Sequence, residues 1–345
     1  MKYLKIIAVT ALILPSIFFL ISFQSTKGAI MSDETGNSNS KIPIVFAAYA
    51  EDETDLEHIL ILAESMRAFG GKYKNAPIWV YAPDSLIDVH KEMVAKLGGY
   101  GAEVKSSHAP AESMNYYYSG KTFAAAKAES EAQGKAAILV WMDEDTIVLR
   151  EPDALVLPAG TCLGYRPVMH QLIGSTYSEP PDAFWSRVFE KLSIPDSSFF
   201  PMMTVADGKT IRPYFNAGLL AVRPECGILR KWIEDYKTLY GDSVFLEMAR
   251  QEPKIIIFLH QVALSGAILK TIKRNEMMEL PGWYNFPMFF KQMFGGLHEF
   301  DSIDSVVTLR YHDYFRKPDP EWSRKLKGPA ELILWLKNRL DKKTK

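Results

Sequence analysis

The chain has 345 residues, enough to bury a large core in one domain or in two. Its formal net charge at pH 7 is -1, because 40 Lys and Arg residues nearly balance 41 Asp and Glu residues. This balance excludes the strongly basic surface by which proteins bind nucleic acid, so we expect no nucleic-acid partner. The two cysteines, Cys162 and Cys226, are too few for a disulfide framework. We predict two buried free thiols, with a single disulfide as the alternative.

The N-terminal end of the chain has the pattern of a membrane-targeting segment. Lys2 and Lys5 precede an apolar stretch at residues 6–23, which is short for a membrane span and long for the core of a signal peptide. We predict that residues 1–30 form a signal anchor or a signal peptide. An uncleaved anchor that crosses the membrane once is favoured, because Lys27 stands where a cleavage site needs a small residue.

The positive-inside rule gives this anchor a direction. It places Lys2 and Lys5 in the cytoplasm and the remainder of the chain on the far side of the membrane. Residues 31–41 are mostly Ser, Asn, Asp, Glu and Gly without an apolar period, which predicts a flexible linker. The folded domain is expected at residues 42–345.

Strand and helix patterns alternate in the first third of this domain. Short apolar runs predict strands, and apolar residues at helical spacing predict helices between them. The predicted strands are residues 42–49, 78–82 and 102–105, and the predicted helices are residues 55–69 and 85–97. Such alternation indicates an α/β fold with parallel strands and right-handed crossovers. Sheets of this kind bind ligands at the carboxyl ends of their strands.

The most informative segment is a buried strand that ends in three acids. Residues 137–142 are mostly apolar and are followed by Asp143, Glu144 and Asp145. In an extended chain Asp143 and Asp145 point the same way and Glu144 points the opposite way, so two carboxylates can face one divalent cation. The alternative is a polar turn that closes the strand.

Two later segments add to this motif. Phe215-Asn-Ala-Gly218 starts a second apolar run with a small polar corner, and His312 follows a third run and precedes Lys317-Pro318. In this order the segments resemble the glycogenin-like branch of the nucleotide-sugar glycosyltransferases. The resemblance covers about residues 42–322. It implies the GT-A fold, a Rossmann-like mixed sheet with helices on both faces.

The resemblance also implies a metal site. Asp143, Asp145 and His312 correspond to the residues that hold a divalent ion in this branch. One imidazole and two carboxylates suit manganese better than magnesium or calcium, so Mn²⁺ or, second, Mg²⁺ is the expected cofactor.

Other positions are implied to hold the nucleotide-sugar donor. These are Ala48, Tyr49, Lys121, Asp143, Gly218 and Lys317. Lys121 and Lys317 would contact the donor phosphates, and Ala48 and Tyr49 would lie beside the nucleotide base. The alternatives are a solvated lysine at a helix start for Lys121 and a plain strand end for Ala48 and Tyr49.

Three residues are implied to face the reacting sugar: Asn216, His260 and Gln261. The amide of Asn216 both donates and accepts, which suits sugar hydroxyls. The branch usually has an Asp where this chain has His260, so a carboxylate near the reacting carbon is missing. A neutral His can act as a base or bind a hydroxyl, or it can simply cap a helix. We predict a strand at residues 255–264 that passes into a helix at His260.

Four further segments have weaker signals. Residues 169–212 show little regular pattern and are expected to form a wall of the acceptor site. The aromatic residues at 283–294 predict either an acceptor platform or a buried core. Amphipathic helices are predicted at residues 224–240 and 330–340, both packed on the domain.

The expected function follows from the resemblance. It is metal-dependent transfer of a sugar from a nucleotide-diphosphate donor, of the UDP-linked kind, to a glycan, lipid or protein acceptor. The alternative is a catalytically inactive envelope protein with the same fold, which binds a glycan or a protein partner. His260 and the apparent export of the domain favour this alternative.

Overall fold

The computed structural model of the chain describes residues 41–113, 116–288, 302–311 and 321–341. The predicted anchor or signal peptide at residues 1–30 lies outside the described residues. All of the predicted linker except Lys41 lies outside them as well.

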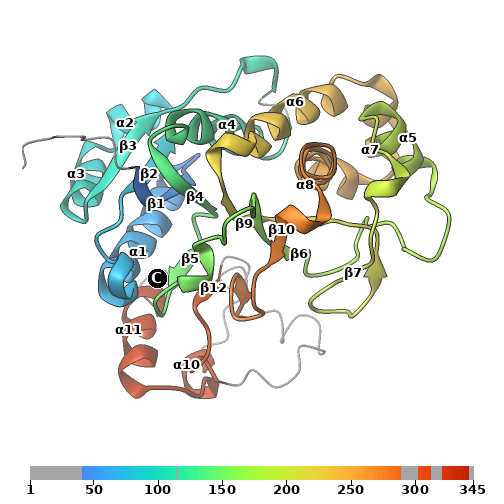
Figure 1. Cartoon of the computed structure of the whole chain (residues 1–345). Coiled ribbons are helices and arrows are strands. Elements are labelled where there is room, and N and C mark those ends of the chain that lie inside the picture. Colours follow the sequence, from blue (N-terminus) through green and yellow to red (C-terminus); the bar gives the residue numbers. More distant parts are fainter. Residues whose placement is uncertain (1–40, 114–115, 289–301, 312–320, 342–345) are drawn as a thin grey trace, which may run out of the picture. The chain divides into compact units, whose positions relative to one another are not determined.

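A seven-stranded sheet carries the site, with the strand order β10-β6-β9-β4-β1-β2-β3 (Figure 1). Strands β1 to β4 run parallel, as the alternation of strands and helices predicts. Strand β9 runs antiparallel to β4 and β6, and β10 is parallel to β6, so the sheet is mixed. The strands are β1 Ile42–Tyr49, β2 Ile78–Ala82, β3 Ala102–Ser106, β4 Ala136–Met142, β6 Leu163–Pro167, β9 Phe215–Val222 and β10 Met277–Glu279. The predicted α/β class is confirmed.

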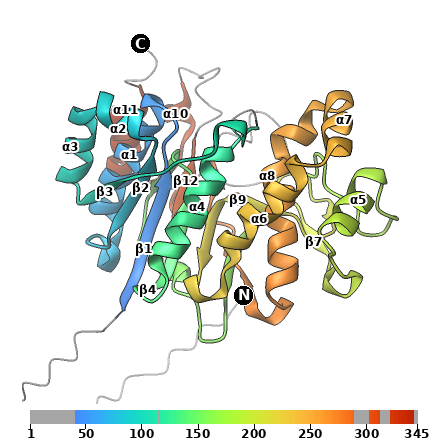
Figure 2. The ribbon, with the colours of Figure 1, turned by 90° about the horizontal axis from the view of Figure 1, so that it is seen from above.

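Helices cover both faces of this sheet (Figure 2). Side chains of β1 alternate between two cores, because Ile44 and Phe46 point to one face and Val45 and Ala47 to the other. Helices α1 and α3 pack on the first face, and α4, α6 and α8 pack on the second. These helices are α1 Glu53–Phe69, α3 Lys91–Gly99, α4 Ser119–Ala132, α6 Ile228–Tyr240 and α8 Pro253–Thr271.

Two predicted helices have different boundaries in the structure. Residues 85–97 form two helices, α2 Asp84–Val89 and α3, because His90 leaves the helical conformation between them. Residues 224–240 form a 3₁₀ turn, Pro224–Cys226, and then α6. Gly227 separates the turn from the helix with a φ of 73°, which glycine adopts without a steric penalty.

The largest correction concerns residues 255–264, which were predicted to be a strand that passes into a helix at His260. They belong to helix α8, which begins with Pro253 directly after the capping residue Glu252. The run of isoleucines indicated a strand, but this helix is apolar on most sides because it is buried on most sides. Within the described residues, α8 is the one helix long and apolar enough to cross a membrane, and 61% of its apolar window is buried inside the domain.

The segment at residues 169–212 contains more regular structure than predicted. It includes α5 Ala183–Lys191 and a small antiparallel sheet of β7 Met202–Met203 and β8 Thr210–Ile211. The side chain of Asp182 caps α5 by accepting from the amide of Trp185 at 2.8 Å. Another short helix, α7 Ser243–Gln251, lies between α6 and α8.

A third core joins the end of the described chain to the site. Strand β12 Thr308–Arg310 pairs with β11 Phe286–Pro287 and, antiparallel, with β5 Thr146–Val148. Helices α10 Trp322–Lys325 and α11 Ala330–Leu340 complete this core. Leu332, Leu336 and Leu340 are buried, which confirms that the last predicted helix packs on the domain.

The two cysteines form a disulfide, so the prediction of free thiols was wrong. Cys162 lies directly before β6, and Cys226 ends the 3₁₀ turn that follows β9. Because β6 and β9 are neighbours, pairing of the strands brings together two residues that are 64 positions apart in the sequence.

Candidate functional site

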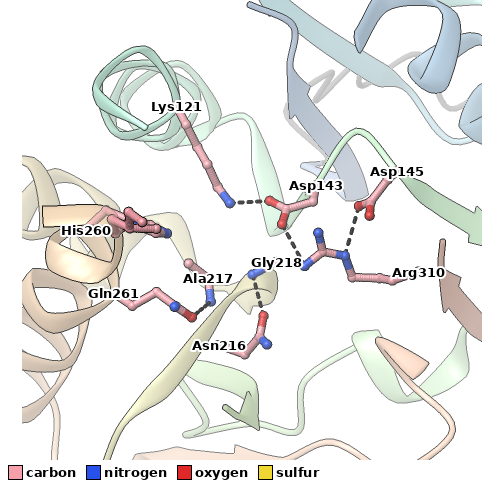
Figure 3. A network of polar contacts seen from close by, with 10 residues as sticks. Lys121, Asp143, Asp145, Asn216, Ala217, Gly218, His260, Gln261 and Arg310 are labelled. Carbon is pink, nitrogen blue, oxygen red and sulfur yellow. Dashed lines mark hydrogen bonds and ion pairs between the residues drawn. The ribbon is translucent and has the colours of Figure 1, made fainter. Parts of the chain in front are cut away.

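Two aspartates stand at the carboxyl end of the central strand. Asp143 and Asp145 follow β4, and their residues are only 7% and 1% exposed. The amide of Asp143 donates to the carbonyl of Gly218 at 2.9 Å, which fixes this corner against β9. Both carboxylates contact Arg310 (Figure 3). They do so from a turn between β4 and β5, the alternative to an extended segment, because the amide of Thr146 donates to the carbonyl of Asp143 at 3.2 Å.

Two cations neutralise these carboxylates. The Nη1 of Arg310 lies 2.8 Å from Asp143 Oδ2, and its Nε lies 2.9 Å from Asp145 Oδ1. The Nζ of Lys121, at the start of α4, bonds to Asp143 Oδ1. Burial alone would raise the pKa of Asp143, but Arg310 and Lys121 outweigh it and lower this pKa below its usual value. Asp143 is therefore ionised and paired on both oxygens.

The aspartate pair does not fit a divalent ion in this arrangement. A hard cation needs carboxylate oxygens that turn their lone pairs toward it. Here both oxygens of Asp143 and one oxygen of Asp145 accept from Lys121 and Arg310. A metal ion would first have to displace these side chains.

Gly218 and Asn216 lie directly beneath the ion pairs (Figure 3). A Cβ atom at Gly218 would come within 2.4 Å of Arg310 Nη1 and 2.8 Å of Asp143 Oδ2, so this position has no room for a side chain. The side-chain oxygen of Asn216 accepts from the amide of Gly218 at 2.7 Å. The segment Asn216-Ala-Gly218, which was expected to interrupt the apolar run, is instead part of β9. Its small residues leave room for Asp143 and Arg310 to pack against the strand.

His260 and Gln261 reach the site from helix α8. Burial, together with the charge of Lys121, lowers the pKa of His260 to about 3, so its imidazole is neutral. Its Nδ1 lies 3.0 Å from the carbonyl of Ile257, and its ring contacts that of Tyr118 with 4.2 Å between centroids. The side-chain oxygen of Gln261 accepts from the amide of Ala217 at 3.4 Å.

Tyr49 and Ala48 differ in their access to this site. The hydroxyl of Tyr49 packs against Gly120 in the first turn of α4, where a Cβ would come within 2.0 Å of it. This places Tyr49 next to Lys121. The side chain of Ala48 is fully buried in the core on the other face of the sheet, so a donor contact from this residue would have to come from its backbone.

A second polar cluster lies next to the end of β4. Asp55 and His58 of α1 and Glu144 offer ligand atoms within 4.8 Å of one another, and this set could hold a metal ion. Burial raises the pKa of Glu144 to about 8, with Asp145 and Asp143 adding to the shift. Burial also raises the pKa of Asp55 to about 6. Such carboxyl groups gain from a cation that replaces their protons.

Some predicted site residues cannot be placed. His312 and Lys317 lie outside the described residues, so their roles stay predictions. Of the aromatic segment at 283–294, residues 283–288 are described. Trp283 is 42% exposed there, whereas Tyr284 and Phe286 are buried, so the described part is mainly core.

Sequence reasoning missed two residues of the site. Arg310 ends β12, and only the pairing of β12 with β5 brings it to the aspartates. Tyr118 stands directly before α4 with a φ of 62°, in the left-handed region that few residues other than glycine adopt. Its ring lies over Lys121 Nζ, 5.6 Å from the centroid. Each of the two stands at the end of a helix or strand and within three residues of a predicted site residue, and this position was the signal in the sequence.

Comparison with known families gives one match. Residues 51–271, more than half of the chain, match the family described as the Rhodobacterales glycosyltransferase domain. No curated protein matches the chain.

Several solved structures are similar to the chain at low identity. Galactosyltransferase LgtC in complex with donor and acceptor sugar analogues has a TM-score of 0.48 and 14% identity, and the match covers 86% of this chain and 100% of that chain. Mouse xyloside xylosyltransferase 1 in its apo form has a TM-score of 0.47 and 12% identity, over 81% of this chain and 100% of that chain. Glycosyltransferase GlyE of Streptococcus pneumoniae has a TM-score of 0.45 and 16% identity, over 88% of this chain and 61% of that chain. Likeness at this level assigns no role to individual residues.

Proposed function

Because this chain belongs to the family of Rhodobacterales glycosyltransferase domains, we propose that it transfers a sugar from a nucleotide-diphosphate donor, of the UDP-linked kind, to a glycan, lipid or protein acceptor. The observation that carries the proposal is the position of the polar corner. Asp143 directly follows β4 and Tyr49 ends β1, and the strand order reverses between these two strands. Open α/β sheets bind their ligands at such a switch point.

The residues of the corner suit the departure of a diphosphate. Negative charge grows on the leaving oxygen as the bond to the sugar breaks, and a fixed cation there lowers the barrier. Lys121 is held in this place by Asp143, and Lys317 is the second cation that the resemblance implies. Asn216 and Gln261 offer amides to the sugar hydroxyls. His260 is neutral, and its lowered pKa makes it a weak base, so it contributes hydrogen bonds rather than charge.

The expected cofactor, Mn²⁺ or Mg²⁺, would have to bind at one of two candidate sites. Asp143 and Asp145 with His312 form the expected site, but Arg310 and Lys121 occupy the first two carboxylates. No step of the reaction is therefore derived through a metal there. The cluster of Asp55, His58 and Glu144 is a second group of residues that could hold such an ion.

The proposal includes export of the domain behind a single-pass N-terminal anchor. The disulfide between Cys162 and Cys226 supports it, since disulfides persist in oxidising compartments outside the cytosol. The acceptor would then be a molecule at or beyond the membrane. The closer likeness to the glycogenin-like branch is part of the same proposal and rests on the three sequence motifs.

The inactive binding protein is the second candidate. The replacement of the usual acid by the neutral His260 favours it, because no carboxylate then stabilises positive charge at the reacting carbon. The test is a panel of nucleotide-sugars given to the full chain in detergent, with release of the nucleotide as the readout. Activity with one donor that is lost in Lys121→Met supports transfer. If the panel yields no activity while a nucleotide still binds, the chain is the inactive form.

A further inference from the structure

Arg310 occupies the position between the two aspartates that a bound cation would take. Its guanidinium bridges Asp143 and Asp145, and Lys121 takes the remaining oxygen of Asp143 (Figure 3). Two negative and two positive charges meet there, so the corner is already neutral. Burial opposes the charge of Arg310, but the aspartates outweigh it and raise the pKa of Arg310 above its usual value.

The backbone fixes Arg310 in this place. It pairs with Thr146 in the antiparallel ladder of β12 and β5, directly beside Asp145. Gly218 leaves the space that its Nη1 fills, because a Cβ there would lie 2.4 Å from this nitrogen. The arginine is therefore part of the packed corner, held on one side by β5 and on another by β9.

The guanidinium retains donors that can meet a ligand. An arginine has five N–H groups in a planar fork that matches phosphate oxygens. The carboxylates engage the Nε–H and one Nη1–H. The side chain of Arg310 is 24% exposed, in contrast to 1% for Asp145, so it is the more accessible of the two. Lys121 likewise uses one of its three donors on Asp143.

We propose that Arg310 and Lys121 replace the divalent cation in this chain: they bind the donor diphosphate directly, and donor binding needs no metal. The inference rests on the proposed function, because it presumes a nucleotide-diphosphate donor. The aspartates then serve to position the two cations and to keep the empty corner neutral.

The first experiment compares UDP binding with and without metal. Calorimetric titration of UDP into the full chain in detergent is carried out with EDTA and again with millimolar Mn²⁺. We expect the two dissociation constants to agree within about twofold. Binding that is about tenfold or more tighter with Mn²⁺ overturns the inference and leaves the proposed function intact. An absence of UDP binding under both conditions removes the proposed function and the inference with it.

A variant at Arg310 should show the opposite behaviour, in which UDP binding depends on metal. Arg310→Gln removes the guanidinium charge, so Asp143 Oδ2 and Asp145 Oδ1 lose their ion pairs with it. We expect UDP binding in EDTA to weaken about tenfold or more, and Mn²⁺ to restore part of the loss. The matched control is Arg339→Gln. Arg339 lies outside the site, and its Nη2 pairs with Glu64 Oε1 at 2.6 Å. This control should leave UDP binding metal-independent.

Arg310→Lys serves as a second variant at the same position. It is used if Arg310→Gln does not fold. Lysine keeps the charge but cannot contact two carboxylates and a phosphate at once. UDP binding in EDTA should therefore weaken several-fold, and Mn²⁺ should restore part of the loss. Unchanged UDP affinity in a folded variant at Arg310 overturns the inference, because the guanidinium would then make no contact with the diphosphate.

Discussion

Substitution of Gly218 by Ala should disrupt the corner more than its size suggests. The added methyl group would lie 2.4 Å from Arg310 Nη1, 2.8 Å from Asp143 Oδ2 and 3.0 Å from Asn216 Oδ1. Ordinary contacts of such an atom begin at 3.4 Å, so these three atoms would have to retreat by about 1.0, 0.6 and 0.4 Å. The first two atoms form one ion pair, and the methyl group would force them apart.

The expected magnitude has two parts. Overpacking of a close-packed interior costs about 1 to 3 kcal/mol of unfolding free energy. A displacement of about 1 Å in a positioning group can reduce a rate about 100-fold, so kcat/KM for the donor should fall by roughly this factor. Urea denaturation measures the first effect, and nucleotide release from the donor measures the second.

The control is Gly99→Ala in helix α3. No atom lies within 4 Å of a Cβ at this position, and alanine favours a helix over glycine by about 0.5 to 1 kcal/mol. Gly99→Ala should therefore leave activity unchanged and stability equal or slightly higher. If Gly218→Ala behaves like Gly99→Ala in both measurements, the close packing of the corner described here is wrong.

Three further predictions concern charge and covalent structure. The pKa of Glu144 is raised to about 8 by burial and by Asp145, so the folded state prefers its neutral form, and stability falls as pH rises from about 4.5 to 8. Glu144→Gln should thus gain about 1 to 3 kcal/mol over the parent at about pH 9 and little at about pH 4.5, as urea denaturation at both values would show; an equal gain at both values contradicts the shift. The pKa of His260 is lowered to about 3 by burial, so its neutral form contributes stability that is complete above about pH 6.5 and is lost as the pH falls toward 3. Between about pH 7 and 4.5 the parent should lose about 2 kcal/mol more than His260→Gln, and equal losses would show that the imidazole is not protected from protons. Replacement of Cys162 and Cys226 by Ser should cost about 2 to 4 kcal/mol, and dithiothreitol should lower the melting temperature of the parent while leaving that of the double variant unchanged.

The elements that sequence patterns predicted correctly are those whose signal is local. The apolar runs of β1 and β4 and the helical spacing in α1 appear in the structure within two or three residues of their predicted bounds. The extended geometry expected for Asp143 and Asp145 is not found, because these residues form the turn between β4 and β5, and their common contact with Arg310 depends on β12.

The features that were missed depend on contacts between distant segments. Helix α8 resembled a strand because its burial on most sides removes the polar face that marks a helix. Arg310 reaches Asp145 across 165 positions in the sequence, through the pairing of β12 with β5. The disulfide likewise requires β6 and β9 to be neighbours. Periodicity carries no information about such pairings.

Calorimetric titration of UDP into the parent and into Lys121→Met tests the central claim most directly. The claim is that the corner of Asp143, Lys121 and Arg310 binds the diphosphate of a nucleotide-sugar donor. The parent should bind UDP, and the variant, which keeps the length of the side chain but not its charge, should bind about tenfold more weakly or worse. Equal UDP affinity in both proteins, or no binding to the parent, would contradict the claim.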